Sequence, residues 1–433
     1  MSEIDERMGA DERTAPSDQT VEAWRAFAAE RGLPLEEARA VELAMSAGTT
    51  RELKQGVSAD ASASRSSARE IAVMLACAAG TGIVARTLIW SITNVATDSW
   101  WHRPLLALSP LVILGALAGY LMSRRQDRRS VAAAVALIFG AGTAVLTIFP
   151  DTVGAVPLGS SSDSWWLAFM HLLVVEVFAV GLAHIGPDWR SPAARMEFVR
   201  FAGEAFIYYV LIALGGGVLT ALTIGVFSAI GIDAEVLVTE WILPVSAAGA
   251  VIVAAWLAET RRALGAGIAP LLARIFTPLF SGVLLALIGG IVWTRGIGQF
   301  DRDLLIAFDA LLVLVVALVI YNVSNREPAA GPGLYDRLQL ALIGSALAVD
   351  LFVLVKVALR LAEFGFTPNR TAIIGLNLIL LANLVWAAVL QWRLARGRGE
   401  FGPVVAWQMR YLTVYALWAT IVTVVFPPLF GFR

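Results

Sequence analysis

From Glu70 to the C-terminus, the chain is a series of apolar runs of about 20 residues separated by short polar loops. An α-helix rises 1.5 Å per residue, so such a run crosses the roughly 30 Å of hydrocarbon in a bilayer. Only helices satisfy every backbone polar group within one segment there. We count about eleven runs, which predict an all-α, polytopic helical membrane bundle. The runs are approximately 71–91, 104–123, 130–149, 165–186, 201–230, 239–258, 275–295, 304–323, 338–361, 371–392 and 410–430.

Composition supports the membrane class. Only 15% of the 433 residues are charged, 58% are hydrophobic, and the mean hydropathy is +0.73, whereas about a quarter of a soluble chain is charged. The formal net charge of −1 provides no basic surface for nucleic acid, so we expect no nucleic-acid partner.

Sequence signatures of catalysis and of cofactor binding are missing. The single cysteine and the three histidines have no metal-ligand spacing, and there is no HExxH, G-x-S-x-G or Walker sequence. We therefore predict that the protein is not an enzyme and has no metal and no cofactor.

The N-terminal region reads as a separate cytoplasmic segment over residues 1–54. Its polar, acidic start lacks the regions of a signal peptide, so we expect no cleavage. Residues 20–32 and 34–48 each have helical patterning and end in glycine, which predicts a small helical hairpin. A Ser/Ala-rich linker follows over 55–69, and 70–433 form the transmembrane domain.

Arginines in the loops predict the orientation. With the N-terminus in the cytoplasm, 16 arginines fall on the inner side and 6 on the outer side. The sequence thus predicts a cytoplasmic N-terminus and an outer C-terminus. Abundant arginine and alanine with scarce lysine are typical of a bacterial chain, which places the protein in a bacterial cell membrane.

Small residues predict two packing features. Gly115 and Gly119 in the second run and Gly140 in the third lie at spacings that favour close helix contacts. The long fifth run contains Gly215 to Gly217. These glycines favour a continuous, tilted helix over a discontinuous one, because no proline or polar cluster accompanies them.

Ionisable residues inside the runs are the candidate functional residues, since burial of a charge in hydrocarbon is costly. Four lie about five or six residues from the predicted outer ends of their runs and share one depth: Arg86, His171, Asp309 and Lys356. One interpretation is an Asp309–Lys356 ion pair. The other is that Lys356 and Arg86 extend separately to the outer surface.

Glu176 and Asp350 lie deeper. Asp350 is about 120° from Lys356 around its helix, so it needs a partner on another helix, a wet cavity or a proton. Our hypothesis is a functional polar cavity that contains Asp350 and Glu176. The alternative is that each makes an isolated hydrogen bond between helices.

A short element precedes the tenth run, with Gly365, Thr367, Asn369 and Arg370 in the sequence GFTPNR. It resembles an element of a bacterial family of multi-pass membrane proteins of unknown function, in a likeness that covers roughly 190–430. The hairpin around Trp24 resembles a permease-prefix domain. These resemblances imply a polytopic helical fold and a permease-like role, without a substrate.

Two functions remain open. The first is a secondary transporter of a small solute or a proton through the bilayer. The second is a membrane sensor or regulatory protein that binds a protein partner through the N-terminal hairpin.

Overall fold

The computed structural model describes residues 25–26, 29, 68–95, 102–124, 127–149, 152–153, 156–157, 163–230, 232–263, 269–293, 302–328 and 331–432. The chain forms two compact units, Met1–Val73 and Met74–Arg433. In the first unit only Arg25, Ala26, Ala29 and residues 68–73 are described, all of them helical. The predicted hairpin and linker therefore lie outside the described residues, except for these three hairpin positions and for Ala68 and Arg69 of the linker, which are helical.

The second unit is helical, apart from one short antiparallel strand pair. A first helix, Ala68–Asn94, enters it. The elements that follow are α3 (His102–Pro110), η1 (Leu111–Gly115), α4 (Ala116–Arg124), η2 (Asp127–Val131), α5 (Ala132–Thr147), β1 (Thr152–Val153), β2 (Val156–Pro157), α6 (Asp163–Ile185), η3 (Gly186–Asp188), α7 (Pro192–Ala229), α8 (Glu235–Leu237), η4 (Val238–Ile242), α9 (Leu243–Ala263), α10 (Ala269–Trp293), α11 (Arg302–Asn325), α12 (Leu334–Phe364), α13 (Pro368–Ala395), α14 (Phe401–Val424) and α15 (Phe426–Leu429).

Ten helices in the described part are long and apolar enough to cross a membrane, and they coincide with the first ten predicted runs. A multi-pass membrane protein is therefore confirmed at this level. The remaining predicted run, 410–430, falls on α14, a helix of 24 residues that carries Gln408 and Arg410. These two polar residues lower its hydropathy, so the total of eleven spans stays a prediction.

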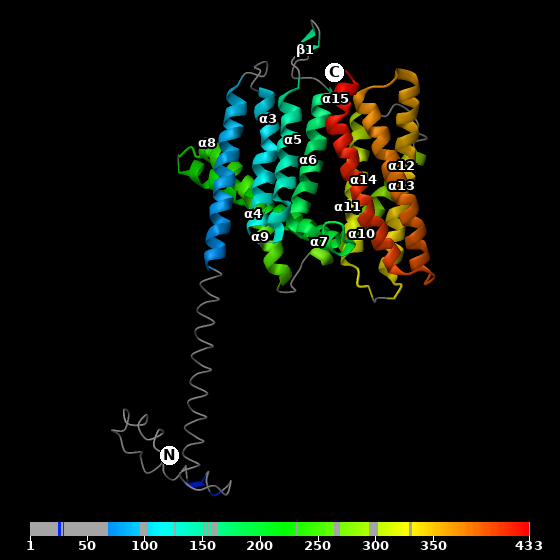
Figure 1. Ribbon diagram of the computed structural model, residues 1–433, viewed down its shortest axis with the longest axis horizontal. Helices are drawn as coiled ribbons and strands as arrows, with labels where there is room; N and C mark the ends of the chain where they lie inside the picture. The colour runs from blue at the N-terminus through cyan, green and yellow to red at the C-terminus, as the bar shows by residue number, and fades with distance from the viewer. Residues whose placement is uncertain are drawn as a thin grey trace, which may run out of the picture. The chain divides into compact units, whose positions relative to one another are not determined.

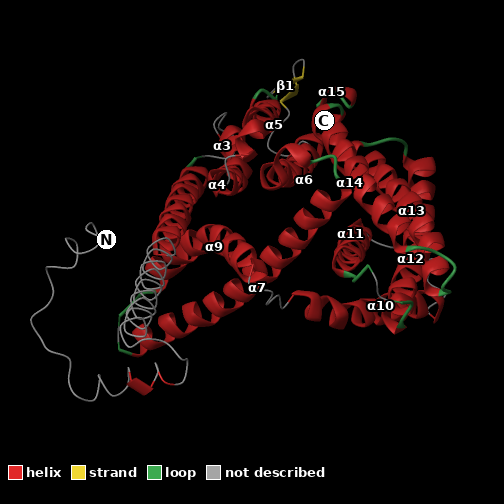
Figure 2. Ribbon diagram, turned by 60° about the horizontal axis from the view of Figure 1, so that its bottom comes forward, coloured by secondary structure: helices red, strands yellow, loops and turns green. Residues whose placement is uncertain are grey.

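Two large hydrophobic cores organise this unit. One joins α10 to α14 and has Leu312, Leu342 and Leu384 at its centre. The other joins the first helix, α4, α5, α6, α7 and α9, with Leu121, Phe201 and Ile252 fully or almost fully buried. Figure 1 shows α3, α5 and α6 standing beside α14 and α12–α13. Helix α7 runs obliquely between the two groups (Figure 2) and contacts members of both, including α9 and α11.

Helix α7 is continuous through Gly215 to Gly217, which confirms the interpretation of one unbroken helix. It begins at Pro192, where a proline fits because its missing N–H has no helical acceptor. Arg195 and Arg200, two of the 16 arginines that were counted in loops on the inner side, are therefore helical residues. Beyond Phe206 most of the helix is exposed and apolar, as expected for a surface in contact with lipid.

The close helix contacts predicted at Gly119 of the second run and Gly140 of the third are wrong. A Cβ at Gly119 or Gly140 would meet no atom within 4 Å, so neither permits a close helix contact. The close approaches occur elsewhere. A Cβ on Gly82 would lie 2.3 Å from the Val245 carbonyl oxygen. Spacing along one helix does not tell which of its faces meets a neighbour.

Candidate functional site

A buried polar cluster lies between α11, α12 and α13. Asn377 of α13 donates from Nδ2 to Asp309 Oδ1 of α11 at 2.8 Å, and to the Ile373 carbonyl at 2.9 Å. Asp350, at the middle of α12, interacts electrostatically with Asp309. The exposed fractions of Asp309, Asp350 and Asn377 are 7%, 0% and 0%. Packing of three helices thus joins Asp309 to Asn377 inside the apolar bundle, with Asp350 near enough for the two carboxylates to influence one another.

This acidic cluster has more acceptors than donors. Both Asp350 oxygens, Asp309 Oδ2 and Asn377 Oδ1 are buried and have no hydrogen-bond partner among the described residues. Buried polar atoms are normally paired, and an orphaned one costs about 1–3 kcal/mol. Four such oxygens on three helices that pack against one another favour a cation or a proton.

A second, satisfied network adjoins the acidic cluster. Asn383 Nδ2 donates to Gln408 Oε1 at 3.2 Å and to the Tyr415 hydroxyl at 2.7 Å. Its Oδ1 accepts from Trp407 Nε1 at 2.7 Å. Tyr415 also interacts electrostatically with Asp350. Helix α14 therefore extends the polar interior of the bundle, a contribution that the sequence reading missed because it did not consider Gln408 and Tyr415.

The predicted Asp309–Lys356 ion pair is not formed. Asp309 binds Asn377 and has no ion pair with any residue that the structure describes. The Lys356 ammonium lies 5.8 Å from the Phe352 ring centroid on its own helix. Counting from predicted helix ends gave the depth of each side chain but not its direction around the helix, and packing placed Asn377 against Asp309 instead.

Arg86 and His171 lie apart from the acidic cluster. The Arg86 side chain is 5% exposed and pairs through Nη2 with Glu240 Oε2 of η4 at 3.4 Å. Its guanidinium also lies 4.6 Å from the Trp241 ring centroid. His171 Nδ1 lies 2.8 Å from the Leu167 carbonyl oxygen, one turn earlier in α6. Both residues therefore have local structural partners.

Glu176 of α6 is fully buried, and neither carboxylate oxygen has a hydrogen-bond partner among the described residues. No described contact joins it to Asp350 or Asp309. The cavity that we expected Glu176 and Asp350 to share therefore stays a prediction.

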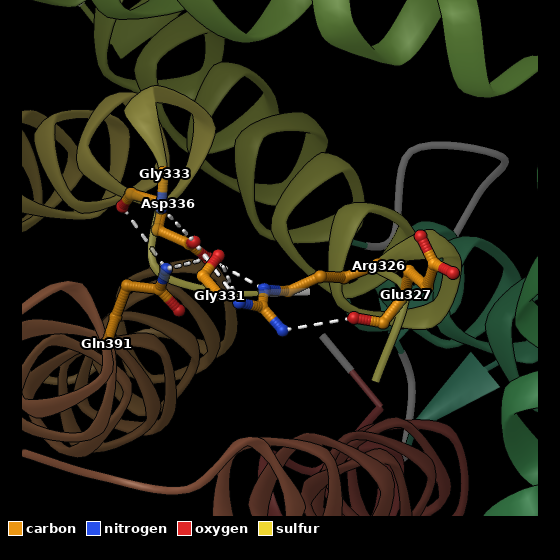
Figure 3. Close-up of polar contacts among 6 residues, drawn as sticks. All are labelled: Arg326, Glu327, Gly331, Gly333, Asp336 and Gln391. Carbon is orange, nitrogen blue, oxygen red and sulfur yellow. Dashed lines mark hydrogen bonds and ion pairs between the residues drawn. The ribbon is translucent and has the colours of Figure 1, made fainter. Parts of the chain in front are cut away.

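A polar clasp closes one end of the α11–α14 bundle (Figure 3). Arg326 donates from Nε and Nη2 to the two carboxylate oxygens of Asp336, at 2.8 and 3.2 Å. Asp336 also accepts from the Gly333 N–H at 3.0 Å and from Gln391 Nε2 at 3.4 Å. The Arg326 guanidinium lies 4.7 Å from the Phe401 ring centroid of α14. This clasp, made by Arg326, Asp336 and Gln391, lies on the predicted cytoplasmic side.

The GFTPNR element forms the opposite turn, between α12 and α13. Gly365 ends α12 with φ of +77°, and the Thr367 side chain caps α13 by accepting from the Arg370 N–H at 3.4 Å. Arg370 Nη1 donates to the Gly365 carbonyl at 3.0 Å, and Asn369 Nδ2 donates to Asp163 Oδ2 of α6 at 2.7 Å. Gly365, Thr367, Asn369 and Arg370 thus each have a capping or bridging role.

In the described part of the chain, no three His, Cys, Asp or Glu side chains gather closely enough to hold a metal ion. The acidic cluster offers two carboxylates and an amide oxygen, a set that suits a proton or a monovalent cation. The family resemblance stays a prediction, because no protein-family model matches the chain and no similar curated protein or solved structure is found.

Proposed function

We propose that the protein is a secondary transporter in which α11–α14 carry a coupling-cation site. Asp309 and Asp350 would take up and release a proton or a monovalent cation in step with a small solute. The observation that carries this proposal is the set of four buried oxygens without donors inside the membrane domain.

The physical basis is electrostatic. Two carboxylates in a site of low dielectric constant repel one another, and a bound cation removes that repulsion. The free-energy difference between the cation-free and the cation-bound site therefore depends strongly on how much water reaches the carboxylates. In an alternating-access cycle that amount of water changes. Ionisable residues in membrane interiors commonly mark ion and proton pathways.

The clasp provides this mechanism with a set of polar contacts that can break and re-form. It joins α11, α12 and α13 through side chains on one side of the acidic cluster. Release of Arg326 from Asp336 would let these helix ends move apart and admit water toward Asp350. In this proposal the clasp is the inner gate.

Cation flux in proteoliposomes tests the proposal. Full-length protein is reconstituted, and proton entry is followed with an internal pH dye under an imposed potential, with ²²Na⁺ uptake measured in parallel. Both are measured with and without a panel of small solutes, because a coupled transporter moves its cation only together with its solute. We expect wild type to exceed protein-free liposomes for one of the two cations. Asp350→Asn should return that flux to background, because the amide keeps the shape and removes the charge.

The matched control is Glu363→Gln, an exposed acid on the same helix, which should leave the flux unchanged. Equal background flux of wild type and Asp350→Asn for both cations would contradict the proposal. The sensor hypothesis depends on the N-terminal hairpin, which lies outside the described residues, and it stays a prediction.

A further inference from the structure

An apolar groove lies where the two groups of helices meet, with α5 and α6 on one side and α14 on the other. Its volume is about 520 Å³. Its walls are almost entirely hydrocarbon and include Leu137 and Ala141 of α5, Phe178 and Leu182 of α6, and Leu412 and Ala416 of α14. Leu137 is 70% exposed and Ala141 is exposed, so the groove opens sideways, where hydrocarbon surrounds a membrane domain.

One end of the groove carries positive charge. Arg195 lines it together with Trp189, beside the turn between α6 and α7. Arg195 Nε donates to the Trp189 carbonyl at 2.8 Å, and its Nη1 donates to the Met409 carbonyl at 2.7 Å and to Thr413 Oγ1 at 3.0 Å. These bonds fix the guanidinium in place, and Nη2 makes no hydrogen bond within the described part of the chain.

A second guanidinium adds to this charge. Arg190 lies 4.5 Å from the Trp189 ring centroid and Arg195 lies 5.9 Å from it, so one indole contacts both. No carboxylate forms an ion pair with Arg195 among the described residues. The mouth of the groove therefore presents a positioned donor and a net positive charge to the membrane interface.

We propose that this groove binds an anionic phospholipid of the surrounding bilayer. One acyl chain lies in the groove, and the phosphate accepts hydrogen bonds from Arg195 Nη2. The wall from Leu412 to Val424 spans about 18 Å at 1.5 Å per residue, a length comparable with one bilayer leaflet. A second copy of the chain packed there through apolar side chains would leave Arg195 without an anion.

Photolabelling tests this site independently of transport. Full-length protein is placed in phosphatidylcholine nanodiscs that contain a small fraction of phosphatidylglycerol with a diazirine in one acyl chain. Adducts are mapped by mass spectrometry, and phosphatidylcholine with the same labelled chain serves as the reference. Both lipids have the phosphate, but the choline ammonium of phosphatidylcholine cancels its charge and is repelled by Arg190 and Arg195. We expect phosphatidylglycerol to label the groove peptides of α5, α6 and α14 about tenfold more strongly, because each arginine near an anionic lipid contributes about 1 kcal/mol.

Two variants act on different parts of the site. Arg195→Gln removes a phosphate donor and one of the two positive charges, so it should lower labelling by both lipids and lower the phosphatidylglycerol-to-phosphatidylcholine ratio severalfold, and Arg195→Lys should restore part of that ratio. Ala141→Phe keeps Arg195 and fills the groove, so it should abolish labelling by both lipids. The matched controls are Ala134→Phe, at an exposed position of α5, and Arg393→Gln, at an exposed position of α13. Both should label like wild type.

Equal labelling of wild type by the two lipids would overturn the proposal, since it would mean that bulk acyl chains fill the groove regardless of head group. Unlabelled groove peptides, or cross-links between two copies through α5 and α14, would overturn it in favour of a protein contact.

Discussion

The buried acids differ in how many donors reach them. Asp336 accepts from Arg326, the Gly333 N–H and Gln391, and Asp309 accepts from Asn377 alone. The Asp350 and Glu176 oxygens have no donor among the described residues. A carboxylate with a full set of donors maintains structure. A buried carboxylate without donors lowers the stability of the fold, and residues that are retained at such a cost typically serve function.

This contrast predicts opposite effects of the same chemical change. Asp350→Asn should raise the free energy of unfolding by about 1 kcal/mol, because the new amide N–H groups can reach nearby acceptors. Asp336→Asn should lower it by about 3 kcal/mol, because Arg326 loses its buried partner. Thermal unfolding of the two purified variants in one detergent measures both signs. Destabilisation by Asp350→Asn would mean that donors satisfy this carboxylate after all.

At the scale of single elements, the turn between α12 and α13 explains why the GFTPNR element has its sequence. Gly365 has a left-handed backbone, Thr367 caps the next helix, and Pro368 occupies its first turn. The sequence contained these signals, because glycine followed by threonine and proline is typical of a helix end and a new start. The bridge from Asn369 to Asp163 was not predictable, since 206 residues separate the two in the chain.

Glycine substitutions on α12 test this turn. Gly365→Ala should cost about 1 kcal/mol or more, since a Cβ is disfavoured at φ of +77°. Gly344→Ala, at a position in the same helix where a Cβ meets no atom within 4 Å, should be neutral or slightly stabilising. Thermal unfolding compares the pair. Equal losses at both positions would show that the backbone at Gly365 relaxes to accept a side chain.

At the scale of the whole membrane unit, α7 links two groups of helices with separate cores. Its contact with α11 depends on Gly203, where a Cβ would lie 2.3 Å from two ring carbons of Tyr321. Run length predicted the spans because the bilayer fixes it. Which groups pack together could not be predicted, because the lipid-facing and protein-facing sides of these helices are similarly apolar, as the exposed leucines of α7 illustrate.

A leucine scan of α7 tests the link. Gly203→Leu should destabilise the protein by about 1–3 kcal/mol, because Tyr321 must move. Gly216→Leu on the same helix meets no atom within 4 Å and should have little effect. Limited proteolysis of the loops together with thermal unfolding would detect separation of the two helix groups. An unchanged Gly203→Leu variant would argue that Tyr321 has room to rotate.

The Asn383 network also has a consequence for biosynthesis. Three of its partners, Gln408, Tyr415 and Trp407, are on α14, which leaves the ribosome after α13. Until then Asn383 is a polar side chain in a helix without its acceptors, at a cost of about 1–3 kcal/mol. A chain stopped before Phe401 would keep that defect permanently. Synthesis of α14 is therefore a condition for a stable membrane bundle, and chains truncated before it become recognisable substrates for membrane proteases.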